Sequence, residues 1–401
     1  MASERFATFA DINWSNAVPH HNTVFHAILK HVPWAVFDRL VGEHDADARV
    51  RCFSSKQQFI ALLYGQLAGA NSLRAIVTEL KSHAARLYHV GADEVHRSTF
   101  ADANAKRPHQ VFTELLSFLM AHAHRGLRRK LVDLVYLIDS TSLRLSGLSQ
   151  DWARFSANAV GAKLHVIYDP HADRPIYAVM TTANINDITA AKAMPITPGA
   201  TYVFDLGYYD YAWWAELDAQ GCRIVTRFKS NTPLSVIAEQ PVAEGGNILS
   251  DRIGHLPARQ GRSRRNPFQD PVREVRVKTE TGKVLRILCN DLDATAEEIA
   301  ELYKRRWAIE LFFRWVKQTL RITRFLGTSE NAIRIQIAVA LIAFLLLRLA
   351  QATQHAVSSP LAFARLVSAN LMHRRPLDQL HRPLVPPPDD HRQLLLAIAH
   401  A

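Results

Sequence analysis

The sequence predicts an α/β protein in which a mixed sheet with packed helices follows an all-helical N-terminal part and is interrupted by a β-rich insertion. Three observations predict this fold class. Residues 1–125 show helical hydrophobic periods with almost no strand signal. From residue 131 onward, short apolar runs of strand length appear, first consecutively and later alternating with helical segments. Residues 228–291 are polar and punctuated by turn signals.

The N-terminal part, residues 1–125, is expected to be a helical DNA-binding domain. The segment KQQFIALLYGQL is followed by the breaker GANS and by SLRAIVTELKSHAARLYHV, with a further helix predicted at STFADANAKRP. Two helices joined by a short turn that contains glycine, followed by a third helix, resemble a helix-turn-helix layout. A plain helical or dimerising bundle gives the same pattern, so that alternative stays open.

The first part of a sheet-containing core is predicted at residues 126–227. The runs LVYLID, AKLHVIYD and PIYAVMTTA are predicted strands, as are TYVFD and RIVTRF further on. Between the last two runs, YYDYAWWAELDAQG is typical of a helix that Gly221 ends. These elements together predict a mixed sheet with helices packed on it.

Three segments complete the predicted organisation. Residues 228–291 form a β-rich insertion, with short strand-like runs such as REVRVKT and KVLRILCN. Residues 292–350 are helical and return to the core. Residues 351–401 form a C-terminal helical tail.

The longest apolar run, residues 337–347, is well short of the ~20 residues that span a bilayer, so it is predicted to be a buried core helix.

Composition narrows the possible partners. The formal net charge is +11 and the pI is about 9.7, which favour a polyanionic partner such as DNA, although an ordinary basic enzyme is the alternative. The three cysteines, Cys52, Cys222 and Cys289, form no CxxC pair, which fits a reducing cytosol. The N-terminus has no secretory pattern, and no membrane partner is expected.

Two aspartates each follow an apolar strand. Asp139 ends LVYLID and Asp205 ends TYVFD. A carboxylate at the end of a buried strand is costly unless it meets a partner or a metal ion. Ligands gather at the carboxyl ends of strands in open sheets, so these two side chains are expected to converge there.

A third acid lies in the helical segment LYKRRWAIELFFRWVKQTL, residues 302–320. At about 100° per residue, Glu310 shares a stripe about 60° wide with three other polar side chains. Its companions in that stripe are Tyr303, Arg306 and Lys317. A salt bridge from Glu310 to Arg306 or Arg314 explains Glu310 alone. Two aspartates and one glutamate together, however, form an oxygen-rich set that suits Mg²⁺ or Mn²⁺, and a pair of such ions serves phosphoryl transfer.

These residues resemble a known family. Tyr303, Arg306, Glu310 and Lys317 form Y-x2-R-x3-E-x6-K, the YREK signature of bacterial DDE transposases of the insertion-sequence-four family. The segments IDSTSLRL, VFDLGYYDY and VTRFKSN also resemble that family, over roughly residues 90–345. The resemblance implies an RNase H-like core that a β insertion interrupts before the glutamate helix.

The resemblance also implies roles and partners. Asp139, Asp205 and Glu310 would be the catalytic residues and the ligands of two Mg²⁺ or Mn²⁺ ions, and Tyr303, Arg306 and Lys317 would contact the DNA of the element ends. The implied reaction is cut-and-paste transposition of an insertion sequence on double-stranded DNA, with terminal inverted repeats and target DNA as substrates. A homodimer assembled on DNA and a cytoplasmic, nucleoid-associated location in a bacterium are expected.

Further cations are candidates for DNA binding. The run RQGRSRRNPF carries Arg262, Arg264 and Arg265 in a predicted loop of a kind that tracks phosphates. Arg227 and Lys229 lie beside the predicted core. Solvated charges or surface salt bridges would explain these residues as well.

One departure from the family concerns a hairpin intermediate that some members hold by stacking a flipped base on a tryptophan of the insertion. Residues 228–291 contain no tryptophan, and Phe228, His255 or Phe268 could substitute.

Two other functions compete with an active transposase. One is a catalytically inactive DNA-binding relic or repressor of the element ends, and the other is a stand-alone nuclease of the same fold.

Overall fold

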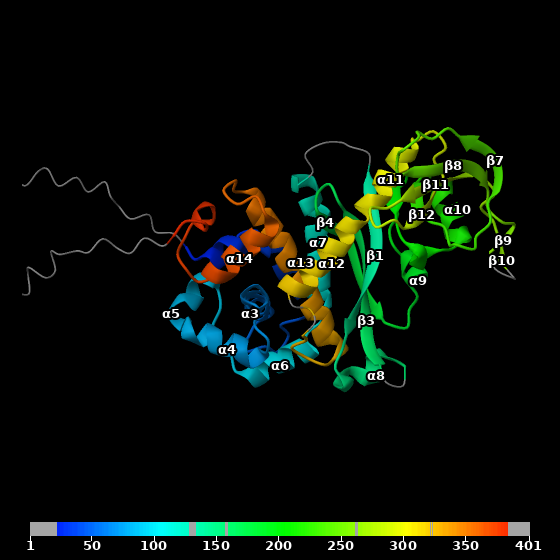
Figure 1. The fold of residues 1–401 in the computed structure, drawn as a ribbon. Coiled ribbons are helices and arrows are strands. Elements are labelled where there is room, and N and C mark those ends of the chain that lie inside the picture. The colour runs from blue at the N-terminus through cyan, green and yellow to red at the C-terminus, as the bar shows by residue number, and fades with distance from the viewer. Residues whose placement is uncertain are drawn as a thin grey trace, which may run out of the picture.

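The protein is described here by a computed structural model, in which residues 22–127, 134–156, 159–260, 264–320, 322 and 324–383 are described. Residues 384–401 of the expected C-terminal tail lie outside the described residues. Figure 1 shows the N-terminal helices at one end, the strands of the core in the middle and the insertion at the other end.

The N-terminal part is helical, as predicted. Ser54 caps α3 with its side chain on the Gln57 N–H, and Gly69 ends the helix in the left-handed conformation at φ 75°. Ser72 then caps α4, so the expected turn between two helices is present. The helices are α1 (Val24–Leu29), α2 (Trp34–Glu43), α3 (Ser55–Ala68), α4 (Leu73–Ser82), α5 (Ala84–Leu87), α6 (Arg97–Lys106) and α7 (Gln110–Leu127), with a 3-10 turn η1 (Tyr88–Val90).

The core sheet has the strand order β4-β3-β1-β5-β6. Strands β1, β3 and β4 are antiparallel neighbours, whereas β1, β5 and β6 are parallel. This is the mixed, RNase H-like sheet that the resemblance implied. The elements of this part are β1 (Val135–Arg144), η2 (Gly147–Ser149), α8 (Gln150–Ala153), β2 (Arg154–Ser156), β3 (Ala159–Asp169), β4 (Arg174–Thr182), α9 (Asp187–Ala191), β5 (Thr201–Val203), η3 (Leu206–Tyr208), α10 (Tyr211–Ala219) and β6 (Arg223–Arg227).

The insertion continues the core sheet. β12 pairs antiparallel with β6, and β11, β8 and β7 follow in that order, so one sheet of ten strands runs from the core to the edge at β7. Within RQGRSRRNPF, predicted as a loop, β9 and β10 pair as two short antiparallel strands, and residues 261–263 lie outside the described residues. The strands are β7 (Ser235–Gln240), β8 (Ile248–His255), β9 (Arg259–Gln260), β10 (Arg264–Arg265), β11 (Val272–Lys278) and β12 (Val284–Cys289).

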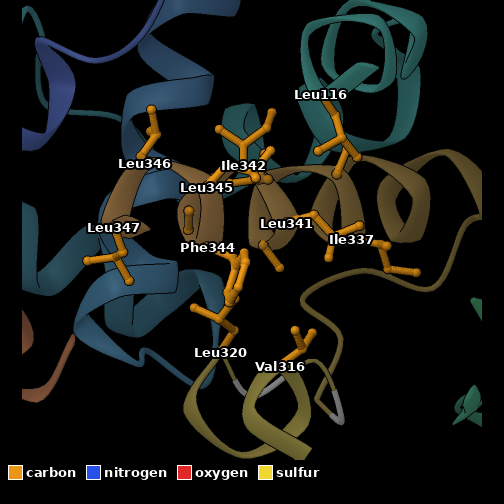
Figure 2. Close-up of a cluster of buried hydrophobic side chains, with 14 of the residues drawn as sticks. Leu116, Val316, Leu320, Ile337, Leu341, Ile342, Phe344, Leu345, Leu346 and Leu347 are labelled. Carbon is orange, nitrogen blue, oxygen red and sulfur yellow. The ribbon is translucent and has the colours of Figure 1, made fainter. Parts of the chain in front are cut away.

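The C-terminal helices cover one face of the sheet and also join the N-terminal helices. The most buried of them, α13, packs on α7, α3 and α12. Figure 2 shows Leu116 of α7, Val316 of α12 and Leu320, which follows α12, around it. Its length and composition would suit a membrane span, but 83% of the apolar window is buried inside the fold, as predicted for a core helix. The helices are α11 (Ala296–Arg305), α12 (Trp307–Thr319), α13 (Glu330–Ala352) and α14 (Pro360–Asn370), followed by η4 (Leu377–Gln379).

The alternation of side chains on the strands decides which face carries the site. Leu137 of β1 and Val203 of β5 belong to the hydrophobic cluster that α12 and α13 complete. Tyr136 and Ile138 belong to a separate cluster, which α10 covers. Because side chains alternate along a strand, a residue two positions after Leu137 or Val203 faces α12.

Candidate active site

Asp139 of β1 and Asp205, two residues beyond the end of β5, lie at the same level of the sheet. Leu137 pairs with Val203 in the parallel register of β1 and β5, and each aspartate lies two residues after its member of that pair. Both carboxylates therefore face α12. The Ser140 N–H donates to Asp139 Oδ1 at 2.7 Å, and the Gly207 N–H donates to Asp205 Oδ1 at 2.8 Å, so each carboxylate is held by its own turn of backbone.

The expectation that the first strand ends at Asp139 is wrong. β1 continues to Arg144, and residues 138–144 pair only with β3. Asp139 thus lies just beyond the end of the parallel partner β5. From there to Arg144, β1 is paired only with its antiparallel partner β3. Local sequence did not reveal this, because Ser140–Arg144 alternates exposed and buried side chains without a strong apolar signal.

Glu310 reaches the two aspartates from α12, which packs on β1. The Arg306 guanidinium lies between the acids: Nη2 donates to Glu310 Oε1 at 2.5 Å, and Nη1 is 3.7 Å from Asp139 Oδ2. The expected continuous helix is interrupted at Arg306, where α11 ends and α12 begins. The stripe is therefore assembled across a junction of two helices, with the Arg306 guanidinium 5.7 Å from the centre of the Tyr303 ring.

Electrostatics at Asp139 favour the neutral acid. Burial, together with the negative charges of Asp205 and Glu310, raises the pKa of Asp139 to about 7, against the lowering effects of the Ser140 N–H and Arg306. The side chain is 17% exposed. One arginine does not compensate three carboxylates, so additional positive charge would stabilise this site.

The donor set fits a divalent cation. All three acids offer only carboxylate oxygens, which Mg²⁺ and Mn²⁺ prefer, and a cation would offset the repulsion that raises the pKa of Asp139. Among the residues that the structure describes, no three His, Cys, Asp or Glu side chains are arranged to hold an ion as they stand. Arg306 instead supplies the positive charge between Asp139 and Glu310.

Comparison with known proteins identifies the family. The model of the family described as Transposase DDE domain matches residues 130–346, more than half of the chain. A Sinorhizobium fredii protein whose name describes it as a transposase is 40% identical over 287 residues, which is 71% of this chain and 79% of that protein. The chain belongs to the DDE transposase family. The resemblance predicted from the YREK signature is confirmed.

Other relatives of this transposase are more distant. A Geobacillus stearothermophilus protein named as a transposase for insertion sequence element IS5377 is 29% identical over 72% of this chain and 76% of its own length. Among solved structures, a piggyBac transposase synaptic complex with hairpin DNA has 12% identity and a TM-score of 0.46, and the match covers 94% of this chain and 84% of that one. Residues 20–93 match a family described only as a domain of unknown function.

The predicted DNA contacts of the transposase fall into two groups. Tyr303, Arg306 and Arg227 lie at the site, since the charges of Arg227, Arg306 and Asp205 all act on the hydroxyl of Tyr303, whose pKa burial raises. Tyr303 itself is only 7% exposed and lies next to Arg306. Lys317 is half-buried about two turns after Glu310, and burial lowers the pKa of its amine.

The remaining predicted contacts lie on the surface. The Lys229 amine is exposed and lies 4.4 Å from the centre of the Tyr209 ring. Arg264 and Arg265 are exposed on β10, in the part of the insertion farthest from the N-terminal helices in Figure 1. Arg262 lies outside the described residues.

The aromatic residues considered for base stacking behave differently from one another. Phe228 and Phe268 are buried, at 3% and 2% exposure, so neither ring is available to a base, whereas His255 is exposed and its Nδ1 bonds the Gln269 carbonyl at 3.0 Å. Trp307, at the start of α12, is 51% exposed, and the Arg314 guanidinium lies 5.7 Å from its ring centre. An exposed aromatic ring beside the site therefore comes from α12 rather than from the insertion.

Sequence reasoning missed one acid at the site. Asp187, at the start of α9, accepts the Ser140 hydroxyl at 2.8 Å and the Lys163 amine at 3.1 Å. It follows a loop rather than an apolar strand, so the strand-end argument that found Asp139 and Asp205 does not apply to it. Lys163 and His165 alternate with apolar residues on β3, and this pattern was the sequence feature that could have indicated a polar partner such as Asp187.

Proposed function

We propose that this transposase cuts the ends of an insertion sequence and joins them to target DNA by a cut-and-paste route. The observation that carries this proposal is the placement of Asp139 and Asp205 at one level of the sheet, facing the helix that carries Glu310. The named insertion-sequence relatives and the net charge of +11 support the same substrate.

Asp139, Asp205 and Glu310 are proposed to hold two Mg²⁺ or Mn²⁺ ions. When bound, such ions activate the attacking oxygen and stabilise the leaving oxygen. The protein's own part is to bring three carboxylates together from two strands and one helix. Asp139 is largely buried, and Arg306 orients Glu310 through a direct hydrogen bond.

Two phosphoryl transfers act on the transferred strand at each element end, and release of the element also requires cleavage of the complementary strand. A water oxygen attacks the phosphorus at an element end, the P–O3′ bond breaks, and the released 3′ oxygen takes up a proton while the water loses one. The freed 3′ hydroxyl then attacks a phosphodiester of target DNA, and the P–O3′ bond of the target breaks. Each step exchanges one P–O bond for another, so the reaction needs no oxidant and no protein nucleophile.

The basic residues are proposed to position DNA. Arg306, Lys317, Arg227 and Tyr303 would act near the scissile phosphate, and Lys229, Arg262, Arg264 and Arg265 would hold the flanking duplex. Synapsis of two element ends implies a homodimer on DNA, and a cytoplasmic, nucleoid-associated location belongs to the same proposal.

Purified protein with linear DNA that bears its terminal inverted repeats tests this function. In Mg²⁺ or Mn²⁺ we expect cleavage at the repeat ends and strand transfer, and we expect Asp205→Asn and Glu310→Gln each to reduce both products by at least about 100-fold. Glu239→Gln, on the exposed strand β7, is the matched control and should be fully active.

Three other results would redirect the interpretation. Specific binding of the ends without either product would favour the relic or repressor. Cleavage without strand transfer would favour a nuclease. Full activity of Glu310→Gln would show that the acids of the site are assigned wrongly.

A further inference from the structure

A fourth carboxylate is connected to the site by direct hydrogen bonds. Asp187 Oδ1 accepts the Ser140 hydroxyl at 2.8 Å, and Ser140 donates its own N–H to Asp139 Oδ1 at 2.7 Å. Ser140 is thus a bridge from Asp187 to Asp139. The side chain of Asp187 is 26% exposed, so it is largely shielded from water without being sealed off.

Residues of β3 fix the position of Asp187. The Lys163 amine donates to Asp187 Oδ1 at 3.1 Å and to the Ile185 carbonyl at 3.0 Å, so it ties the loop before α9 to the sheet. His165 is completely buried, and its Nε2 bonds Thr181 Oγ1 at 2.8 Å. Its Nδ1 has no hydrogen-bond partner and lies 3.8 Å from Asp187 Oδ1. A buried polar atom without a partner is rare in a purely structural setting.

The other oxygen of Asp187 faces the turn that carries Asp205. A Cβ atom built on Gly207 would lie 3.0 Å from Asp205 Oδ1 and 3.3 Å from Asp187 Oδ2. Both carboxylates therefore border the same small space, and a side chain at residue 207 would crowd them. The Gly207 N–H is also the donor that holds Asp205 Oδ1.

We propose that Asp187 is a positioning residue of the active site, which sets the carboxylates of Asp139 and Asp205 for cation binding. It acts on Asp139 through the Ser140 hydroxyl and borders the Gly207 turn that carries Asp205. Lys163 balances the charge of Asp187, so this acid orients its neighbours while its own charge is already compensated. The inference rests on the proposed function of Asp139, Asp205 and Glu310 as cation ligands.

Binding of Mn²⁺ to the full-length protein without DNA, measured by calorimetry, tests the inference. We expect Asp187→Asn to weaken Mn²⁺ binding by about 10-fold, because outer partners of metal ligands have effects of this size. Asparagine is a weaker acceptor than a carboxylate and leaves the Lys163 amine without its anion, so both contacts of Asp187 Oδ1 weaken. Ser140→Ala removes the bridge and should weaken Mn²⁺ binding several-fold. Asp102→Asn, an exposed acid of α6, is the matched control and should bind as the wild type does.

Thermal unfolding in a chelator separates positioning from stability. A positioning role predicts that Asp187→Asn and Ser140→Ala lose affinity for Mn²⁺ while their unfolding temperatures stay within about 3 °C of the wild type. If both variants bind Mn²⁺ as the wild type does, the inference is wrong. If Asp187→Asn does not fold, Ser140→Ala decides alone, and unchanged affinity in that variant overturns the inference.

Asp205→Asn distinguishes this inference from the proposed function. If the wild type binds no Mn²⁺, or if Asp205→Asn binds it equally well, the cation site itself is misassigned. If Asp205→Asn abolishes binding while Ser140→Ala and Asp187→Asn leave it unchanged, only the role of Asp187 fails.

Discussion

Two places in this molecule bury acidic side chains, and the pKa of the buried acid is shifted in opposite directions at the two. In the insertion, Glu274 of β11 is fully buried and contacts Arg252, Arg276 and Arg286. Burial alone would raise the pKa of Glu274, but the three guanidinium groups hold it below its usual range. At the site, burial raises the pKa of Asp139 to about 7, and Arg306 is the cation that opposes this rise.

The two places differ in charge compensation rather than in burial, because both acids are largely buried. Glu274 has three cations for one carboxylate, so the cluster is complete without a ligand. The site has three carboxylates that act on one another and one arginine between them. A buried acid cluster with a deficit of positive charge is a candidate for cation binding, because the missing charge must come from outside the chain.

The largest expected effect is a loss of folding stability when the buried acid of the insertion, Glu274, is neutralised. Glu274→Gln leaves three arginines without their anion, and we expect it to lower the free energy of unfolding by about 3 kcal/mol. Glu310→Gln removes one of three repelling acids, so it should change stability by less than about 1 kcal/mol in a chelator. Urea unfolding measures both, with Glu239→Gln as the exposed control. Equal losses from Glu274→Gln and Glu310→Gln would remove the distinction between the clusters.

The second expected effect is that removing the charge of Asp139 stabilises the protein at high pH but not at low pH. The pKa of Asp139 in the folded protein, about 7, is above its ordinary value of 3.8, so the folded state binds the proton more tightly. Wild-type stability should therefore fall as the pH rises from about 4 to 7, and the cost should be complete above pH 7. Asp139→Asn cannot ionise. In chelator at pH 8 we expect it to be more stable than the wild type by about 1–2 kcal/mol, and equal to it at pH 4.

Thermal or urea unfolding at both pH values checks this prediction. Asp102→Asn, which alters an exposed acid, should show no such difference between the two pH values. A stability gain of Asp139→Asn that is the same at pH 4 and pH 8 would mean that the charge of Asp139 is compensated in the folded protein.

The smallest expected effect is on DNA binding by Arg264 and Arg265, two arginines of the insertion that do not contact Glu274. Arg264 is 75% exposed and 3.7 Å from Asp210, and Arg265 is exposed beside it. If both contact phosphates, the double variant Arg264→Ala/Arg265→Ala should bind duplex DNA about 10-fold more weakly and lower the salt slope by about 2. Arg39→Ala, an exposed arginine of α2, is the control. An unchanged salt slope in the double variant would exclude these phosphate contacts.

The candidate residues Asp139, Asp205 and Glu310 were found because their sequence signals are local. An acid after an apolar strand, as at Asp139 and Asp205, can be recognised without tertiary structure, and so can Glu310 in an apolar helix. The break at Arg306 could not be predicted, because residues 302–320 contain neither glycine nor proline and nothing in them ends a helix. Asp187 was missed because its role depends on Lys163 and Ser140, which lie 24 and 47 residues away in the chain.

The fold was predictable to a similar degree. Strand and helix types follow from periodicity, so the helical N-terminal part, the mixed sheet and the β-rich insertion were all predicted. The pairing of β12 with β6 was not, because a long-range register leaves no local pattern. Nor did the sequence indicate that α13 would pack on both the N-terminal helices and α12.

The pairing of β6 with β12 has a mechanical consequence. Each strand from β1 through β5, β6, β12, β11 and β8 to β7 pairs with its neighbour, so the insertion and the strand that carries Asp139 belong to one continuous sheet. A force on the outer strands of the insertion therefore passes to β1 through paired backbones. Glu310 joins this sheet from a separate helix, so its position relative to the two aspartates depends on the packing of α12 on β1 and not on strand pairing.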